Sequence, residues 1–217
     1  RSLGFERETV NDLLVFHTVF GKSVPDLSLN AIANLGYADM RFGVPVYPGD
    51  TLTAKSEVLG RRESSRGDTG VVWVRTTGRN QRGEGVLTFI RWFLAGKRDP
   101  ETVTGIDDSP ETPESVGIEA LFVPNELRVK QFDAAITGGR AWWGDYEPGE
   151  RIHHIEGVAV EEAEQQMAAR LYQNIARAHF NAYALKDSRF GRRVVYGGHV
   201  ISLARALSFN GLENALR

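Results

Sequence analysis

Four runs rich in β-forming residues lie within residues 28–98, and short turn segments separate them. The runs read SLNAIANLGYADMRF, TLTAKSEVLGRRE, TGVVWVRTTGRN and GEGVLTFIRWFLAGKR. Between them stand YPGD, SRGDTG and NQRGEG, which are rich in the glycine, proline, aspartate and asparagine that tight turns favour. Consecutive strands joined by short turns usually pair with their neighbours in sequence. The pattern therefore predicts an antiparallel meander.

One apolar helix is expected directly before these strands. Asn11 or Asp12 can cap its start. Its apolar residues recur at helical spacing, at Leu13, Phe16, Val19 and Phe20. Gly21 is expected to end the helix, with Pro25 beyond it. A helix followed by an antiparallel sheet places residues 1–98 in the α+β class.

Residues 99–125 differ from their surroundings in composition. The stretch DPETVTGIDDSPETPESVG carries six acidic residues, three prolines and no basic residue. Such a segment buries too little apolar surface to fold by itself. We interpret residues 99–125 as an acidic, proline-containing linker between residues 1–98 and residues 126–217.

The residue pattern of the second half predicts a strand at residues 146–160, a helix at 161–173 and an apolar helix from about Gly198 to Phe209. The acidic first turn of the helix at 161–173 complements the helix dipole. Its expected apolar stripe consists of Ala163, Met167 and Leu171. In the last helix, one apolar face is expected, which consists of Val200, Leu203, Ala204 and Leu207.

The two predicted apolar helices have similar flanking sequences. ERETVNDLLVFHTVF and GRRVVYGGHVISLAR align at an offset of about 185 residues, each with basic residues leading into the helix. Four strands follow the first helix and none follows the second, whereas only the second has a strand and a helix before it. We therefore expect two equivalent modules, both incomplete in this chain, as in the middle part of a longer two-module protein.

Composition excludes several classes of function. The net charge is -2 and the basic residues are scattered, so no nucleic-acid partner is expected. The absence of cysteine removes disulfides and thiolate sites and is typical of a cytoplasmic protein. No apolar run reaches about eighteen residues, so no membrane span is expected. His153 and His154 would point to opposite faces of a strand, and no metal site is predicted.

Several motifs together resemble the MaoC-like hydratases of the hot-dog fold, in which an antiparallel sheet wraps around a long central helix. These motifs are YPGD entering a strand, an Asn-x4-His motif, and FGRRVVYGGHVIS after it. Within that family, LLVFHTVFGKSVPDLSLNAIANLGYADMRFGVPVYPGDTL, RLYQNIARAHFN and GRRVVYGGHVISLARALSFNGL look most like the mesaconyl-CoA hydratases. The likeness spans nearly the whole chain. It implies a double hot-dog fold and reversible hydration of a branched dicarboxylic enoyl-CoA, such as mesaconyl-CoA to β-methylmalyl-CoA, without metal or redox cofactor.

The resemblance also implies site residues. The family motif Asp-x-Asn-Pro-x-His reads NIARAH here, from Asn174 to His179, so that only the histidine is retained. In the family, the acid and the histidine hold a water molecule, which places these roles on Asn174 and His179. A backbone N–H at the start of the central helix binds the thioester oxygen, which places that donor at Gly197 or Gly198.

The residues themselves are consistent with this chemistry. Hydrating an unsaturated thioester requires a base for water, a proton for the α-carbon and donors for the enolate oxygen. Histidine suits the first two roles because its ordinary pKa is about 6.5. Unpaired N–H groups at a helix start suit the third, and glycine lets the thioester approach them. The alternative for Gly197 and Gly198 is a tight turn with no further role.

If the substrate is dicarboxylic, its second carboxylate would be repelled by an aspartate at position 174, which explains the neutral Asn174. A cation is then expected nearby. Arg205 lies seven residues after Gly198, on the same helical face, and is the expected partner of the substrate carboxylate, with Arg177 as the second candidate. The candidates for the CoA phosphates, by position alone, are Arg189, Arg192 and Arg193. His17 is expected to be packed in its helix.

Two other functions remain open from the sequence. A hot-dog thioesterase would use the same helix start but would hydrolyse the thioester, and a non-catalytic acyl-CoA-binding module would do neither. Asn11 and Asp12 occupy the positions equivalent to the two glycines and would crowd a thioester, so the first repeat is expected to be non-catalytic. The expected partners are an acyl-CoA and a second copy of the chain in a homo-dimer.

Overall fold

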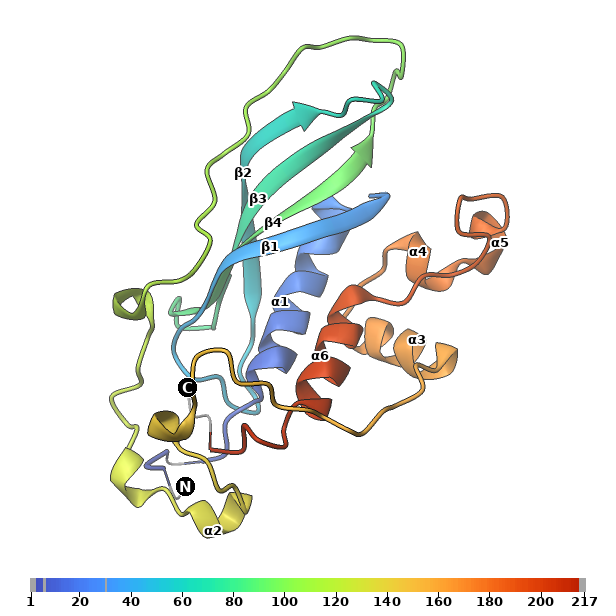
Figure 1. The fold of residues 1–217 in the computed structure, drawn as a ribbon. Helices are drawn as coiled ribbons and strands as arrows, with labels where there is room; N and C mark the ends of the chain where they lie inside the picture. The colour runs from blue at the N-terminus through green and yellow to red at the C-terminus, as the bar shows by residue number, and fades with distance from the viewer. Residues whose placement is uncertain (1–2, 6, 30, 215–217) are drawn as a thin grey trace.

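The sheet contains four antiparallel strands in the order β1-β4-β3-β2 (Figure 1). The computed structural model describes residues 3–5, 7–29 and 31–214. The strands are β1 (Ala33–Phe42), β2 (Thr53–Glu63), β3 (Thr69–Arg79) and β4 (Gly85–Gly96). The predicted meander is confirmed for β2, β3 and β4. β1 pairs with β4 instead of β2, because the connection over residues 43–52 is too long for a tight hairpin and carries the chain across the sheet.

Helix α1 (Asp12–Leu27) lies against one face of this sheet (Figure 1). The predicted cap is confirmed, since the side chain of Asn11 accepts a hydrogen bond from the N–H of Leu13 at 2.9 Å. The predicted end at Gly21 is wrong, because the helix continues through Gly21 and Pro25. A Cβ at Gly21 would lie 1.7 Å from the backbone oxygen of Tyr172. Gly21 therefore serves the close approach of another segment.

The core lies between α1 and β4. Phe16 of α1 meets Phe89 of β4 edge to face, with ring centroids 5.5 Å apart. Each buried Val, Leu or Phe contributes roughly 1.5–3 kcal/mol of hydrophobic free energy. The cluster consists of Val15, Phe16, Val19, Phe20, Val24, Val46, Val86, Leu87, Phe89 and Tyr196. The last member belongs to the second half of the chain, so one core joins the two halves.

Short helices make up most of the regular structure after the sheet. Their bounds are η1 (Ile118–Ala120), η2 (Val129–Gln131), α2 (Ala134–Thr137), η3 (Trp143–Asp145), α3 (Glu162–Leu171), α4 (Arg177–Phe180), α5 (Ala182–Leu185) and α6 (Gly197–Leu207). Residues 99–117 contain no helix or strand apart from one bridge between Arg62 and Asp107. The division into two repeats and a linker stays a prediction.

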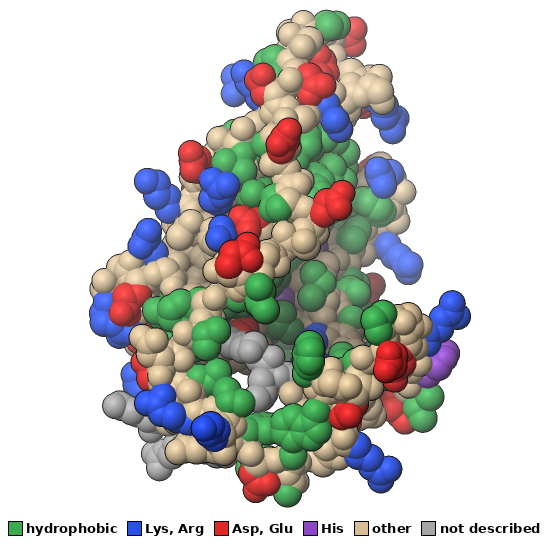
Figure 2. Space-filling model, turned by 60° about the vertical axis from the view of Figure 1, so that its left-hand side comes forward, with side chains coloured by type: hydrophobic (Ala, Val, Ile, Leu, Met, Phe, Trp, Pro, Cys, Tyr) green, Lys and Arg blue, Asp and Glu red, His purple; other side chains and the backbone are tan. Residues whose placement is uncertain are grey.

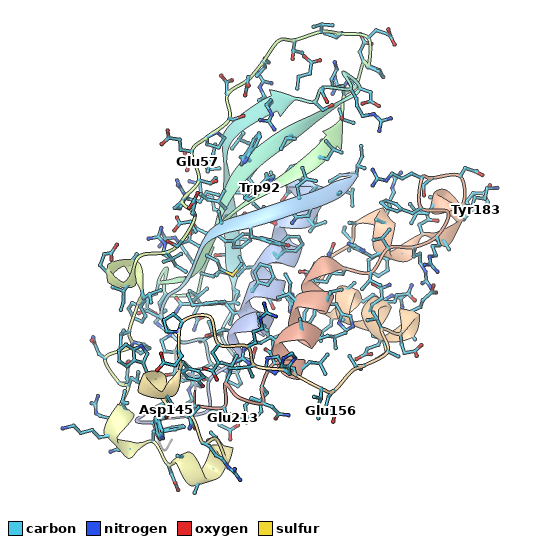
Figure 3. All side chains as sticks on the ribbon, viewed as in Figure 1. Glu57, Trp92, Asp145, Glu156, Tyr183 and Glu213 are labelled. Carbon is cyan, nitrogen blue, oxygen red and sulfur yellow. The ribbon has the colours of Figure 1, made fainter. Side chains whose placement is uncertain are left out.

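The predicted strand at residues 146–160 is wrong. The segment forms no strand and runs past the lower end of α6 to α3, as the position of Glu156 in Figure 3 illustrates. Ile155 is 88% exposed. A strand needs a neighbour for its N–H and C=O groups, and no described strand pairs with this segment. His153 and His154 are accordingly exposed.

The predicted helices at 161–173 and from Gly198 are confirmed as α3 and α6, but their apolar stripes are not. Met167 and Leu171 are 72% and 73% exposed, while Gln165 and Ala169 form the buried side of α3. On α6 the predicted face is divided, since Val200 and Ala204 are exposed whereas Leu203 and Leu207 are half-buried.

Helix α6 lies beside α1, and α3 lies on its outer side (Figure 1). His17, which is buried as predicted, joins the two long helices. Its Nε2 lies 2.7 Å from the hydroxyl of Ser202 in α6, and its Nδ1 lies 3.1 Å from the hydroxyl of Tyr196. Its ring stacks on Tyr172, with centroids 4.4 Å apart. The His17 side chain of the first half thus contacts Tyr172, Tyr196 and Ser202 of the second half.

Charged side chains of both signs lie on the surface (Figure 2). On the face drawn in Figure 2, Lys and Arg side chains are interspersed with Asp and Glu. No helix in the described part of the chain is long and apolar enough to cross a membrane. The described residues contain no group of three or more His, Asp or Glu side chains placed to hold a metal ion.

Candidate active site

A cavity of about 420 Å³ lies between the two halves of the chain. From the first half, α1, β1 and β4 supply part of its lining, including Phe20, Val24, Tyr37, Arg91 and Phe93. From the second half, the segments around residues 174–179 and 190–197 close it. Three of the predicted site residues line this cavity, namely Asn174, His179 and Gly197.

Asn174 is positioned by the end of α3. The N–H of Gln173 donates to the C=O of Arg170 at 3.0 Å, and the N–H of Asn174 donates to the C=O of Ala169 at 2.9 Å. With φ of 59° at Gln173, this is a Schellman ending built without glycine. The turn continues directly under Gly21 of α1. Asn174 is therefore 1% exposed and its side chain is held at the cavity.

His179 has a defined tautomer. Its Nδ1 lies 2.8 Å from the backbone oxygen of Val194. A carbonyl oxygen only accepts hydrogen bonds, so Nδ1 carries the proton and Nε2 carries the free lone pair. Burial lowers the pKa of His179, and the hydrogen bond to Val194 opposes that shift. The imidazole is accordingly neutral near pH 7, as a general base must be.

Gln165 of α3 connects the His179 segment to the start of α6. Its Nε2 donates to the backbone oxygen of His179 at 3.3 Å, and its Oε1 accepts from the N–H of Tyr196 at 3.4 Å. The N–H of Val194 also donates to the C=O of Ala178 at 2.9 Å. These contacts fix the distance between the imidazole and the helix start. Sequence reasoning missed Gln165, because a glutamine on a polar helix carries no signal of burial.

The start of α6 has no side-chain cap. The N–H groups of Gly197 and Gly198 have no acceptor among the described residues, whereas the next N–H groups bond to Tyr196. A Cβ at Gly197 would meet nothing within 4 Å, but one at Gly198 would lie 2.4 Å from the ring of Tyr196. Gly197 thus leaves space beside the free donors, while Gly198 is required by packing.

The predicted arginines fall into two groups. Arg189, Arg192 and Arg193 line a second cavity of about 520 Å³, which shares Phe190, Val194 and Val195 with the first. Arg193 is paired with Glu162 at 2.5 Å. Arg177 and Arg205 are exposed and line neither of these two cavities. The structure thus places Arg189, Arg192 and Arg193 at the second cavity and leaves the expected carboxylate partners, Arg177 and Arg205, outside both.

Arg91 of β4 is a cavity residue that sequence reasoning missed. A signal was present, because alternation along GVLTFIRWFLAG puts Arg91 on the same face as Leu87, Phe89 and Phe93. An arginine on the buried face of an apolar central strand is unusual and indicates either a buried ion pair or a ligand site.

The fold and the cavity define a hot-dog protein of the MaoC-like class. A solved structure of a putative MaoC domain protein dehydratase from Chloroflexus aurantiacus matches with a TM-score of 0.93 and 55% identity, covering 99% of this chain and 61% of that one. A conserved hypothetical protein from Mycobacterium tuberculosis with a double hot-dog fold matches with a TM-score of 0.66 and 25% identity, covering 98% of this chain and 63% of that one.

The chain belongs to the mesaconyl-CoA hydratase family, whose model matches residues 1–211. It is 55% identical to a β-methylmalyl-CoA dehydratase from Chloroflexus aurantiacus, covering 100% of this chain and 61% of the relative. It is 52% identical to a mesaconyl-CoA hydratase from Cereibacter sphaeroides, covering 99% of this chain and 62% of the relative. The chain therefore spans less than two thirds of the length of either curated relative. The family predicted from the sequence motifs is confirmed.

Proposed function

We propose that the protein adds water reversibly to the double bond of mesaconyl-CoA, forming β-methylmalyl-CoA. Membership of the family and the names of the two curated relatives support this substrate. The observation that carries the proposal is the meeting of three groups at one cavity. A histidine with a free Nε2, a buried asparagine and an uncapped helix start all border the same space.

The proposed reaction uses these groups in order. Nε2 of His179 removes a proton from water, and the amide of Asn174 orients that water. The resulting hydroxide adds to the β-carbon of the substrate, while the electrons of the double bond move onto the thioester oxygen. The N–H groups of Gly197 and Gly198 stabilise that oxygen. The imidazolium of His179 then returns the proton to the α-carbon, which leaves the enzyme unchanged.

The CoA part is proposed to lie across the second cavity. Arg189 and Arg192 have no carboxylate partner among the described residues, so they can bind phosphate, whereas Arg193 must first leave Glu162. The shared lining at Phe190, Val194 and Val195 gives the acyl arm a continuous path from one cavity to the other.

The reaction as proposed uses only groups of the chain and of the substrate, so we propose that it needs no cofactor beyond the coenzyme A of the substrate. A cytoplasmic location and a homo-dimer likewise stay proposals.

The experiment is to incubate the full-length protein with mesaconyl-CoA and to follow the absorbance of the conjugated thioester and the release of free CoA. A hydratase removes the absorbance reversibly, and added product restores it. Release of free CoA would indicate a thioesterase instead, and no change with measurable binding would indicate an acyl-CoA-binding module. The described lining of the main cavity contains no Asp or Glu to direct water at the thioester carbonyl, which supports the first outcome.

A further inference from the structure

Arg91 brings a buried positive charge to the wall of the main cavity. It lies on β4, a central strand that pairs with β1 and β3, and it is 1% exposed. A buried charge is costly unless it is paired. The structure therefore raises the question of what compensates Arg91.

The protein compensates this charge only in part. Nη2 of Arg91 donates to the hydroxyls of Ser23 at 3.1 Å and Ser28 at 3.0 Å, beside the end of α1. The guanidinium carbon lies 4.6 Å from the ring centroid of Phe20 and 5.2 Å from that of Phe93. Nε has no partner, and no carboxylate of the described residues forms an ion pair with Arg91.

Arg91 stays charged at neutral pH in spite of this environment. Burial lowers the pKa of Arg91 to about 10, while the neighbouring Tyr37 and Tyr196 oppose the shift. The cavity that Arg91 lines also contains Asn174, His179 and Gly197. Its described lining contains no acidic side chain, so an anion that enters meets an unpaired cation and no like charge.

We propose that Arg91 binds the free carboxylate of the acyl group and so selects dicarboxylic enoyl-CoA substrates. This inference rests on the proposed hydratase function. A guanidinium matches a carboxylate in charge and in the geometry of its paired donors. Ser23 and Ser28 hold one end of the guanidinium in place, and α1 positions both serines, since Ser23 lies within the helix and Ser28 is its C-cap residue.

The position also suits the reaction. In mesaconyl-CoA the free carboxylate is attached to the carbon that receives the hydroxide. Anchoring this carboxylate on Arg91 holds that carbon in the cavity shared by His179 and Asn174, while the thioester extends toward Gly197. Arg205, the carboxylate partner expected from the sequence, is exposed and does not line this cavity, and we propose Arg91 in its place.

The test compares Arg91→Gln with Arg205→Gln in the full-length protein. For each variant, kcat/KM is measured with mesaconyl-CoA and with crotonyl-CoA, which lacks the carboxylate. We expect Arg91→Gln to lose about 100-fold or more on mesaconyl-CoA, as for truncation of one partner of a buried charge pair, and less than about fivefold on crotonyl-CoA. Arg205→Gln should change neither by more than about twofold.

Equal losses of Arg91→Gln on both substrates would overturn the proposal, because they indicate a structural role. Wild-type protein inactive on mesaconyl-CoA would overturn the proposed function first, so the two failures are distinct. If Arg91→Gln fails to fold, two measurements remain. Wild-type protein should bind succinyl-CoA at least about tenfold more tightly than butyryl-CoA, and Ser28→Ala should reduce that ratio. A ratio near one in the wild type would overturn the proposal.

Discussion

Helices α1 and α6, which the sequence pattern predicts to be equivalent helices of two repeats, begin in opposite ways. The start of α1 is closed, since Asn11 accepts the hydrogen bond of the Leu13 N–H. The start of α6 is open, since Tyr196 provides no side-chain cap and Gly197 leaves free space. An uncapped helix start has unpaired donors, which a ligand can use. The difference supports the proposal that a ligand binds at the α6 start, whereas the capped α1 start serves stability.

The two helices also differ in their interiors. Five apolar residues of α1 belong to the buried core, namely Val15, Phe16, Val19, Phe20 and Val24, although Leu14 is 39% exposed. In α6, by contrast, Val200 and Ile201 are 45% and 41% exposed and no apolar residue of the helix is in the core. α1 therefore provides the framework, and α6 is held mainly by His17, Tyr196 and α3.

The largest effect is expected at the histidine beside α6. His179→Ala should reduce kcat by 10²–10⁴-fold, because it removes the proposed general base, while thermal unfolding changes little. Mesaconyl-CoA hydration and a melting curve measure the two quantities, with the exposed His154→Ala as control. Activity above about a tenth of wild type would contradict the assignment of the base.

A stability loss is expected within α1 at Gly21. Helix propensity alone predicts that Gly21→Ala stabilises the protein by about 1 kcal/mol. The structure predicts a loss of about 1–3 kcal/mol, because the new methyl group would overlap the backbone of Tyr172. Turnover should fall as well, since Asn174 follows that segment. Urea denaturation checks the sign, and Lys22→Ala at the neighbouring exposed position is the control.

The two glycines of α6 should respond differently. Gly197→Ala should lower kcat/KM by about 10- to 100-fold with a normal melting temperature, since its methyl group occupies space beside the donors. Gly198→Ala should chiefly lower the melting temperature, because its methyl group meets the ring of Tyr196. The reverse result would mean that Gly198 borders the ligand and Gly197 serves the turn.

A pH dependence is expected from His17, which joins the helices. Burial, and then the nearby His199, lower the pKa of His17 to about 4 from 6.5. The unfolded chain binds this proton between pH 6.5 and pH 4 and the folded chain does not, so stability falls as the pH drops through that window. We expect a loss of about 1–2 kcal/mol, reduced by solvent screening.

Denaturant unfolding at pH 7 and pH 5 measures that slope, and it should be shallower in His17→Gln. Some slope should remain, because burial also lowers the pKa of His179. An unchanged slope in the variant would contradict the role of His17.

The smallest effect is expected at the closed start of α1. Asn11→Ala should reduce the unfolding free energy by about 1 kcal/mol through loss of the cap. The kcat of the folded fraction should stay the same. Asn11→Asp, which keeps an acceptor at this position, should restore most of the stability, and a fall in kcat would show that the α1 start takes part in the reaction.

Local patterns in the sequence predicted most of the regular structure. Strands β2, β3 and β4 follow from β-forming runs between turn residues, and α1 and α6 follow from apolar spacing. The errors occurred where a neighbour decides the outcome. The sequence around Gly21 indicates the end of a helix, but the helix continues because the glycine allows the segment of Tyr172 to pack against it. Residues 146–160 would form a strand only beside a partner strand.

The sequence by itself determined the motif of the site, because Asn174 and His179 lie within one short segment and Gly197 follows closely. The tertiary structure alone decided that Arg91, on a distant strand, reaches the same cavity. The physical reason is that α1 packs against the sheet on one side and against the segment of Asn174 on the other. A side chain on the inner face of β4 therefore meets residues from the far half of the chain, and no local pattern records that contact.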